Sequence, residues 1–119
     1  MSDADPPYAP ERRRKPRSSV SVPLRVYGQD RRLLLRARTV DLSCDGAMVH
    51  GAGPIRVGQP VSVEVSRGEA RNPLTLHAEV VRIDTPCAHR RRHGVAVRFT
   101  DISALDETIL ESIIAAAKR

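Results

Sequence analysis

The sequence predicts an all-β domain that ends in a helix: a six-stranded antiparallel β-barrel with one short α-helix at the C-terminus. Three observations lead to this prediction. Apolar and polar residues alternate in six short segments, turn residues separate these segments, and only the end of the chain changes to helical spacing. No helical segment lies between the strands, so the crossover connections of a parallel sheet are not expected, and a closed or nearly closed barrel fits the pattern.

The first half of the chain contains three expected strands. Apolar residues alternate over residues 20–26, and the polar stretch 27–31 supplies a turn. Residues 33–42 are the second expected strand, and residues 46–50 are a short third strand after a turn at 44–46. Each segment therefore has one face that can be buried.

The second half contains three more expected strands. Valines alternate over residues 61–65, and a long fifth strand covers residues 74–83. The alternation of this strand slips by one residue at Val81, which predicts a bulge and a bend. The sixth strand, residues 95–99, follows a polar and basic connection at 84–94.

The last segment has helical spacing and predicts one apolar stripe on a helix of roughly twelve residues. Ser103 and Asp106 stand at the spacing of a capping box, with Asp an imperfect partner. The simplest interpretation is that the stripe plugs the open end of the barrel, and the alternative is a face that binds a partner. The stripe consists of Leu105, Ile109, Leu110, Ile113, Ile114 and Ala117.

Length and composition indicate one globular domain. The chain has 119 residues, of which 40% are hydrophobic and 3% aromatic, so its core must be built from Val, Leu, Ile and Ala. No apolar run approaches the about 18 residues that span a bilayer. The polar N-terminus has no signal-peptide pattern, and we expect residues 1–10 to be a disordered leader. These features predict a soluble cytoplasmic protein.

The charge of the chain points to an anionic partner. The formal net charge is +6 and the pI is about 10.3. Only Lys15 and Lys118 of the 20 basic residues are lysines, so 18 are arginines, a bias that a GC-rich genome also produces. The positions of the arginines are therefore more informative than their number.

Neither a metal site nor a catalytic site is expected. Cys87, His89 and His93 have spacings that a metal ion can use, but zinc would need a fourth ligand from elsewhere in the chain. A mobile basic hairpin loop is the better interpretation of this segment. The chain has no Ser/His/Asp order, paired carboxylates, Walker loop or GxGxxG fingerprint. We therefore expect a protein that is not an enzyme and holds no cofactor.

Two motifs stand out when they are considered together. Arg12, Arg13 and Arg17 form an RRxxxR pattern just before the first expected strand. A DxSxxG pattern, "DLSCDG" at residues 41–46, lies at the turn between the second and third strands, 24 residues after Arg17. Either motif alone is weak evidence, because arginines are frequent in this chain and "CDG" is ordinary turn chemistry.

The two motifs in this order, followed by a barrel that ends in "GVAVRFTDI", resemble the PilZ domain family of bacterial receptors for cyclic di-GMP. The resemblance covers about residues 11–117. It implies a ligand-binding switch segment at residues 11–19 and a PilZ-like barrel with its helix at residues 20–119.

The resemblance also implies roles for individual residues. Arg13 and Arg17 would hold phosphates and guanine Hoogsteen edges, Asp41 and Ser43 would read guanine, and Gly46 would shape the turn. In the family, an arginine at the position of Arg12 tends to favour an intercalated dimer of the ligand, because it can stack on a second guanine. Arg98, on the last strand, is a weaker candidate for a further contact.

The chemistry of these residue types agrees with such a ligand. Guanidinium groups bind phosphate and guanine O6/N7 in bidentate fashion and stack on purines. Arg13 and Arg17 are about 13 Å apart on an extended segment, so they can reach separate groups of one ligand if the segment wraps around it. The Asp41 carboxylate complements the N1–H and N2–H donors of guanine, and Ser43 can add a hydrogen bond. Gly46 permits a positive φ or a close approach of the backbone to the ligand.

The sequence leaves two alternatives open. A nucleic-acid-binding barrel could use the same arginines, although we do not expect nucleic acid as a partner, because single-strand binders usually present aromatic side chains and this chain has three. A degenerate domain could serve only as an adaptor without ligand. The main prediction is a receptor that orders its N-terminal segment around cyclic di-GMP and signals to a downstream protein that the sequence does not identify.

Overall fold

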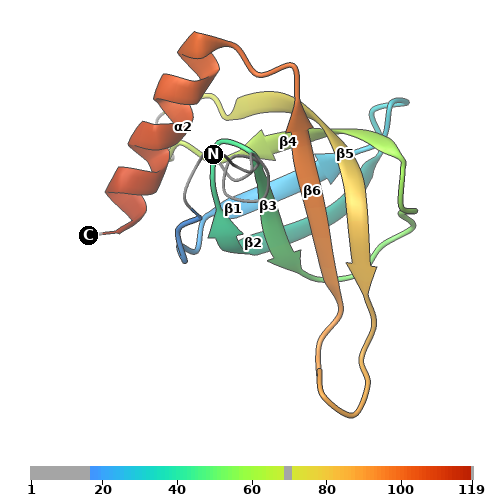
Figure 1. Cartoon of the computed structure of the whole chain (residues 1–119). Helices are drawn as coiled ribbons and strands as arrows, with labels where there is room; N and C mark the ends of the chain where they lie inside the picture. The colour runs from blue at the N-terminus through green and yellow to red at the C-terminus, as the bar shows by residue number, and fades with distance from the viewer. Residues whose placement is uncertain (1–16, 69–70, 119) are drawn as a thin grey trace, which may run out of the picture.

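The computed structural model describes residues 17–68 and 71–118, and it has the predicted architecture. Six antiparallel strands close into a barrel in the order β1-β2-β3-β6-β5-β4, and one helix follows (Figure 1). The elements are β1 (Pro23–Tyr27), β2 (Leu33–Leu42), β3 (Gly46–His50), β4 (Pro60–Val65), β5 (Leu74–Asp84), β6 (Gly94–Thr100) and α2 (Ala104–Ala117).

The alternation predicted for the strands determines which side chains form the core. In β4, for example, Val61, Val63 and Val65 are buried while the residues between them are not. The predicted bulge in β5 is confirmed, because its register with β6 shifts between Val80 and Arg82, and Val81 is exposed to solvent. Phe99 is the only aromatic side chain in the core of the described residues, so aliphatic residues fill the barrel as expected.

The first strand differs from its prediction. Alternation continues from residue 20 to residue 26, but the regular ladder of β1 begins at Pro23. Before Pro23 the side chain of Thr39 replaces part of the ladder, since its Oγ1 accepts the Val22 N–H at 2.9 Å. Val20 and Val22 are nevertheless buried, which is why the sequence pattern extends beyond the regular strand.

The helix begins with the predicted cap. Ser103 is the N-cap residue, and its Oγ accepts the N–H of Asp106 at 3.0 Å. Leu110 is completely buried in the core, and Ile109, Ile113 and Ile114 are half-buried against it. Leu105 remains 68% exposed. The predicted plug is thus correct for the middle of the stripe and wrong for its two ends, Leu105 and Ala117, which are exposed.

The connection between β5 and β6 is a hairpin that extends away from the barrel (Figure 1). Cys87 and Arg90 pair across it, with the Cys87 N–H donating to the Arg90 carbonyl at 2.7 Å. No group of three or more possible metal ligands occurs among the described residues. Over the same part of the chain, no helix is long and apolar enough to cross a membrane.

Candidate functional site

The structure brings the last residue of the first motif to the first residue of the second. Arg17 Nη1 lies 3.6 Å from Asp41 Oδ1, and both side chains are partly exposed. Arg12 and Arg13 lie outside the described residues. Arg17 of the first motif therefore meets Asp41 of the second on the surface of the barrel, at the end of β2.

Backbone hydrogen bonds position Arg17 at this place. The next residue, Ser18, exchanges two hydrogen bonds with Leu42, at 3.0 and 2.9 Å. In an antiparallel bridge the residue before Ser18 lies beside the residue after Leu42. The backbone of Arg17 therefore passes Ser43, and its side chain reaches diagonally to Asp41.

Ser43 has a structural role in the turn after β2. Its side chain is buried, and its Oγ accepts the N–H of Asp45 at 3.0 Å. Its own N–H donates to the carbonyl of Gly46 at 2.9 Å, which closes the turn. A serine at this position of the motif thus shapes the loop that begins β3, whatever it contributes to a ligand.

Gly46 is required by the barrel itself. Of the two reasons for glycine that the sequence left open, a positive φ and a close approach, the first does not apply, because the φ of Gly46 is not positive. A Cβ at this position would lie 2.2 Å from the carbonyl oxygen of Val97 on β6. The predicted close approach is therefore real, but it is an approach of β3 to β6, and glycine is needed because no side-chain atom fits between the two strands.

Arg98 stands beside Gly46 on the neighbouring strand. The two residues are partners in the β3–β6 ladder, and Arg98 forms an ion pair with Glu79 of β5, with Nη2 and Oε1 at 2.5 Å. Ala96, the next outward-facing residue of β6, is also small. Between this ion pair and the one at the end of β2, the outer surface of the barrel carries the small residues Gly46 and Ala96 together with Met48 of β3, which is half-buried and pairs with both Asp41 and Ala96.

Sequence reasoning missed Thr39, which fastens the segment after Arg17. Thr39 is buried, its Oγ1 accepts the Val22 N–H, and the same hydroxyl donates to the carbonyl of Val20. The sequence contained a sign of this role, because Thr39 is a polar residue on the face of β2 that is otherwise apolar and buried. Such a residue needs hydrogen-bond partners, and here it finds them in the backbone of the segment that leads from the first motif.

A comparison with models of protein families gives a match that covers almost the whole chain. The model of the PilZ domain matches residues 11–116, which includes both motifs. A search of curated protein sequences found no match.

Solved structures with the same fold include complexes with a ligand. The chain superposes on the "PilZ domain with c-di-GMP of YcgR" from Escherichia coli with a TM-score of 0.71 and 24% identity, covering 91% of this chain and 92% of that one. It superposes on the PilZ domain of CeSA from a cellulose-synthesizing bacterium with a TM-score of 0.66 and 20% identity, covering 87% of this chain and 99% of that one. The chain also superposes on the MrkH–c-di-GMP complex of K. pneumonia with a TM-score of 0.62 and 13% identity, covering 87% of this chain and 51% of that one.

Proposed function

The chain belongs to the PilZ domain family, whose domains are non-catalytic receptors for cyclic di-GMP, and from this premise we propose that it binds cyclic di-GMP at the surface between Arg17 and Asp41. The observation that carries the proposal is the 3.6 Å contact between these two residues, one from each motif. Residues of opposite charge that meet at one place can bind both a phosphate and the donor edge of a guanine.

The proposed binding segment is residues 11–19, with Arg12, Arg13 and Arg17 as its cationic contacts. Arg17 is more than half exposed even when it is paired with Asp41, so its guanidinium has room for a phosphate as well. Arg13 would take the second phosphate or a guanine Hoogsteen edge. Gly46, Ala96 and the half-buried Met48 between Asp41 and Ala96 form an apolar surface on which a purine can lie, and Arg98 borders that surface.

Asp41 and Ser43 have different parts in this proposal. The Asp41 carboxylate accepts hydrogen bonds from guanine N1–H and N2–H, and it also holds Arg17 in place before the ligand arrives. Ser43 already accepts a hydrogen bond within its turn, so the hydrogen of its hydroxyl is what it can offer to a ligand. We expect Ser43 to act mainly by holding the turn in shape.

Ordering of the N-terminal segment provides the signal. Each charge-assisted hydrogen bond to the ligand contributes about 1.5–3 kcal/mol. Ordering costs about 1–2 kcal/mol for each residue of the segment 12–19 that the ligand newly fixes, whereas Arg17 and Ser18 are already held by Asp41 and Leu42. Since these terms nearly cancel, stacking and contacts to the base edges decide the affinity, and the receptor discriminates guanine from other bases.

Isothermal titration calorimetry with cyclic di-GMP tests the proposal directly, with cyclic di-AMP as the control ligand. We expect a heat of binding when cyclic di-GMP is titrated into the protein, and none with cyclic di-AMP. If Arg12 stacks on a second guanine, the wild-type chain binds two ligands and Arg12→Leu binds one. The absence of binding to either dinucleotide would contradict the proposal and favour a degenerate adaptor domain.

A further inference from the structure

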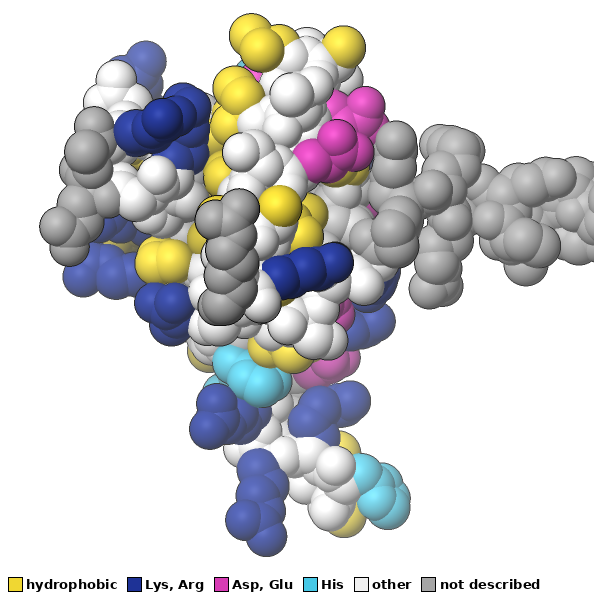
Figure 2. Space-filling view, turned by 90° about the vertical axis from the view of Figure 1, so that its left-hand side faces the viewer, with side chains coloured by type: hydrophobic (Ala, Val, Ile, Leu, Met, Phe, Trp, Pro, Cys, Tyr) yellow, Lys and Arg dark blue, Asp and Glu magenta, His cyan; other side chains and the backbone are white. Residues whose placement is uncertain are grey.

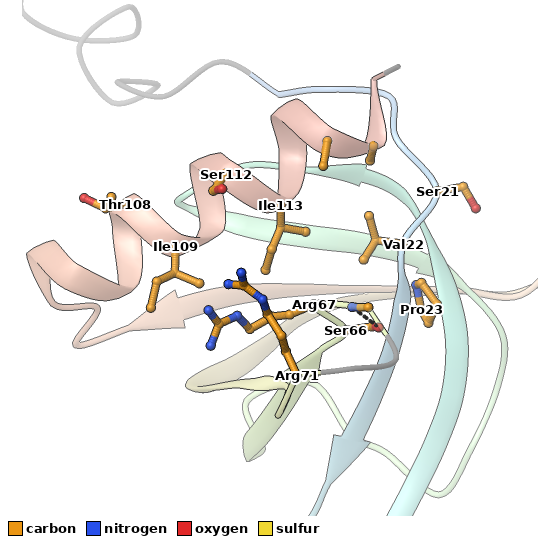
Figure 3. Close-up of a pocket in the computed structure, with 13 residues that line it drawn as sticks. Ser21, Val22, Pro23, Ser66, Arg67, Arg71, Thr108, Ile109, Ser112 and Ile113 are labelled. Atoms are coloured by element: carbon orange, nitrogen blue, oxygen red, sulfur yellow. Dashed lines mark hydrogen bonds between the residues drawn. The ribbon is translucent and has the colours of Figure 1, made fainter.

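A groove of about 830 Å³ lies along α2, and no described residue of either motif lines it. Ile109 and Ile113 of the helix form one wall, and Val22 and Pro23 at the start of β1 form the other (Figure 3). The lining of the groove continues to Ala117. From Ile109 to Ala117 the helix rises about 12 Å, so the groove is long enough for several residues of a peptide.

Two arginines extend into this groove from the connection between β4 and β5. Figure 3 shows the guanidinium groups of Arg67 and Arg71 below α2, facing Ile109 and Ile113. No ion pair of either arginine with a described residue is present. Two like charges that converge beside an aliphatic wall form a site for an anionic group attached to an apolar one.

The positive charge continues outside the groove. An adjoining hollow of about 360 Å³ shares Arg67 and Arg71 and adds Arg25 and Arg36, with Glu64 as the one acidic side chain among its described lining residues. Glu64 lies 3.8 Å from Arg25, so these described residues together carry a net positive charge of three. Figure 2 shows basic side chains gathered on the surface beside the helix.

The strand register places Arg25 between Glu64 of β4, with which it forms an ion pair, and Arg36 of β2. Arg25 and Arg36 are directly opposite each other in the β1–β2 ladder. Like charges at such positions destabilise a sheet. Glu64 offsets this repulsion at Arg25, whereas Arg36 forms no ion pair with a described residue, so a partner's carboxylates would form charge-assisted hydrogen bonds chiefly with Arg36.

We propose that the groove between α2 and β1 binds an acidic peptide segment of a partner protein, with aliphatic side chains on Ile109 and Ile113 and carboxylates on Arg67 and Arg71. The aliphatic wall and the cationic edge together match this chemistry. Nucleic acid matches less well, because the lining residues include no aromatic side chain on which a base could stack.

The position of the groove connects it to the ligand site, and this part of the inference rests on the proposed function. Ser21, Val22 and Pro23 line the groove, and they directly follow the segment that contains Arg17 and Ser18. Ordering of residues 12–19 around cyclic di-GMP would therefore stabilise one wall of the groove. We expect the ligand to tighten peptide binding.

Selection from a phage-displayed library of random 12-residue peptides tests the groove without a known partner. The target is the wild-type protein, and the counter-selection uses Arg67→Glu/Arg71→Glu. A matched control, Arg56→Glu/Arg91→Glu, changes the net charge equally at exposed arginines that do not line the groove. Circular dichroism melting establishes that both variants are folded.

The expected result is enrichment of peptides that combine Asp or Glu with Leu, Ile or Val. The best of them, made synthetically, should bind at least about tenfold more weakly to the groove variant than to wild type in fluorescence anisotropy, and equally to the control, because charge reversal turns attraction into repulsion. No enrichment, or equal binding to all three proteins, would overturn the proposal.

Two further outcomes would assign the groove to another occupant and would also overturn it. These are arginine-dependent binding of a synthetic peptide of residues 1–11, or concentration-dependent self-association that the groove variant abolishes. Calorimetry with cyclic di-GMP on the same proteins separates the two proposals. Peptide binding without dinucleotide binding refutes the proposed function alone, and dinucleotide binding without peptide binding refutes the groove alone.

Discussion

At the scale of single residues, the contact between Arg17 and Asp41 matters most for the proposed function. Both side chains are partly exposed, and their 3.6 Å ion pair contributes little to stability, as is usual at a protein surface. Removing either side chain should therefore leave the barrel intact. This separation of fold from binding makes the pair a clean test of the proposed site.

We predict that Arg17→Ala lowers the affinity for cyclic di-GMP by at least about tenfold, because a charge-assisted contact worth about 1.5–3 kcal/mol is lost. The melting temperature should change by less than about 2 °C. Calorimetry and thermal denaturation measure the two quantities. Arg56→Ala, at an exposed arginine outside the site, is the control and should bind as wild type does. Wild-type affinity in Arg17→Ala would exclude the proposed mechanism.

Gly46 illustrates a motif residue that serves the fold. We predict that Gly46→Ala destabilises the protein by about 1–3 kcal/mol, because the new Cβ would lie 2.2 Å from the Val97 carbonyl oxygen. Urea denaturation measures the change. Gly94→Ala is the matched control, since its Cβ would meet only the end of the flexible Met48 side chain, at 2.4 Å. An equal loss in both variants would refute the explanation by backbone contact.

At the scale of elements, the important feature is the attachment of the segment before β1 to β2. Residues 18–22 follow β2 through the Ser18–Leu42 bridge and the Thr39 hydroxyl, instead of through a regular ladder. A strand held by a few specific hydrogen bonds can separate locally more easily than one in a full ladder. The segment is thus suited to respond to a ligand bound just before it.

We predict that Thr39→Val destabilises the protein by about 1–3 kcal/mol, since the buried Val22 N–H and Val20 carbonyl lose their partner while the side-chain volume is nearly unchanged. Hydrogen exchange should become faster at residues 18–22 before it does so in the rest of the barrel. Thr39→Ser keeps the hydroxyl and should retain most of the protection. Uniform exchange in both variants would contradict a local role for Thr39.

At the scale of the whole molecule, the net charge of +6 raises the question of whether the arginines bind a dinucleotide or a polyanion. The described part of the chain has basic side chains in several places, including Arg90, Arg91 and Arg92 on the β5–β6 hairpin. If the arginines bound the phosphates of a nucleic acid, the affinity would fall steeply as the salt concentration rises, and no carboxylate would be needed. A guanine-reading site would require Asp41.

We predict that raising the salt from 50 to 200 mM weakens cyclic di-GMP binding by less than about tenfold, because the ligand carries only two phosphates. Asp41→Ala should abolish detectable binding under both conditions. Fluorescence anisotropy of a labelled random duplex, titrated in parallel, provides the comparison. Tight duplex binding that survives Asp41→Ala, together with weak dinucleotide binding, would favour the nucleic-acid alternative.

The sequence by itself determined the barrel, its six strands, the β5 bulge and the cap at Ser103, because alternation, turn residues and capping spacing are local patterns that burial and hydrogen bonding impose directly. It also identified both motifs. Only the tertiary structure decided that Arg17 forms an ion pair with Asp41, that Gly46 packs closely against β6, and that the Thr39 hydroxyl is hydrogen-bonded to the backbone of residues 20–22. These contacts join residues from different strands. A local pattern can mark Thr39 as a buried polar residue and Gly46 as a site of close approach, but the partners of these residues depend on the register and closure of the barrel.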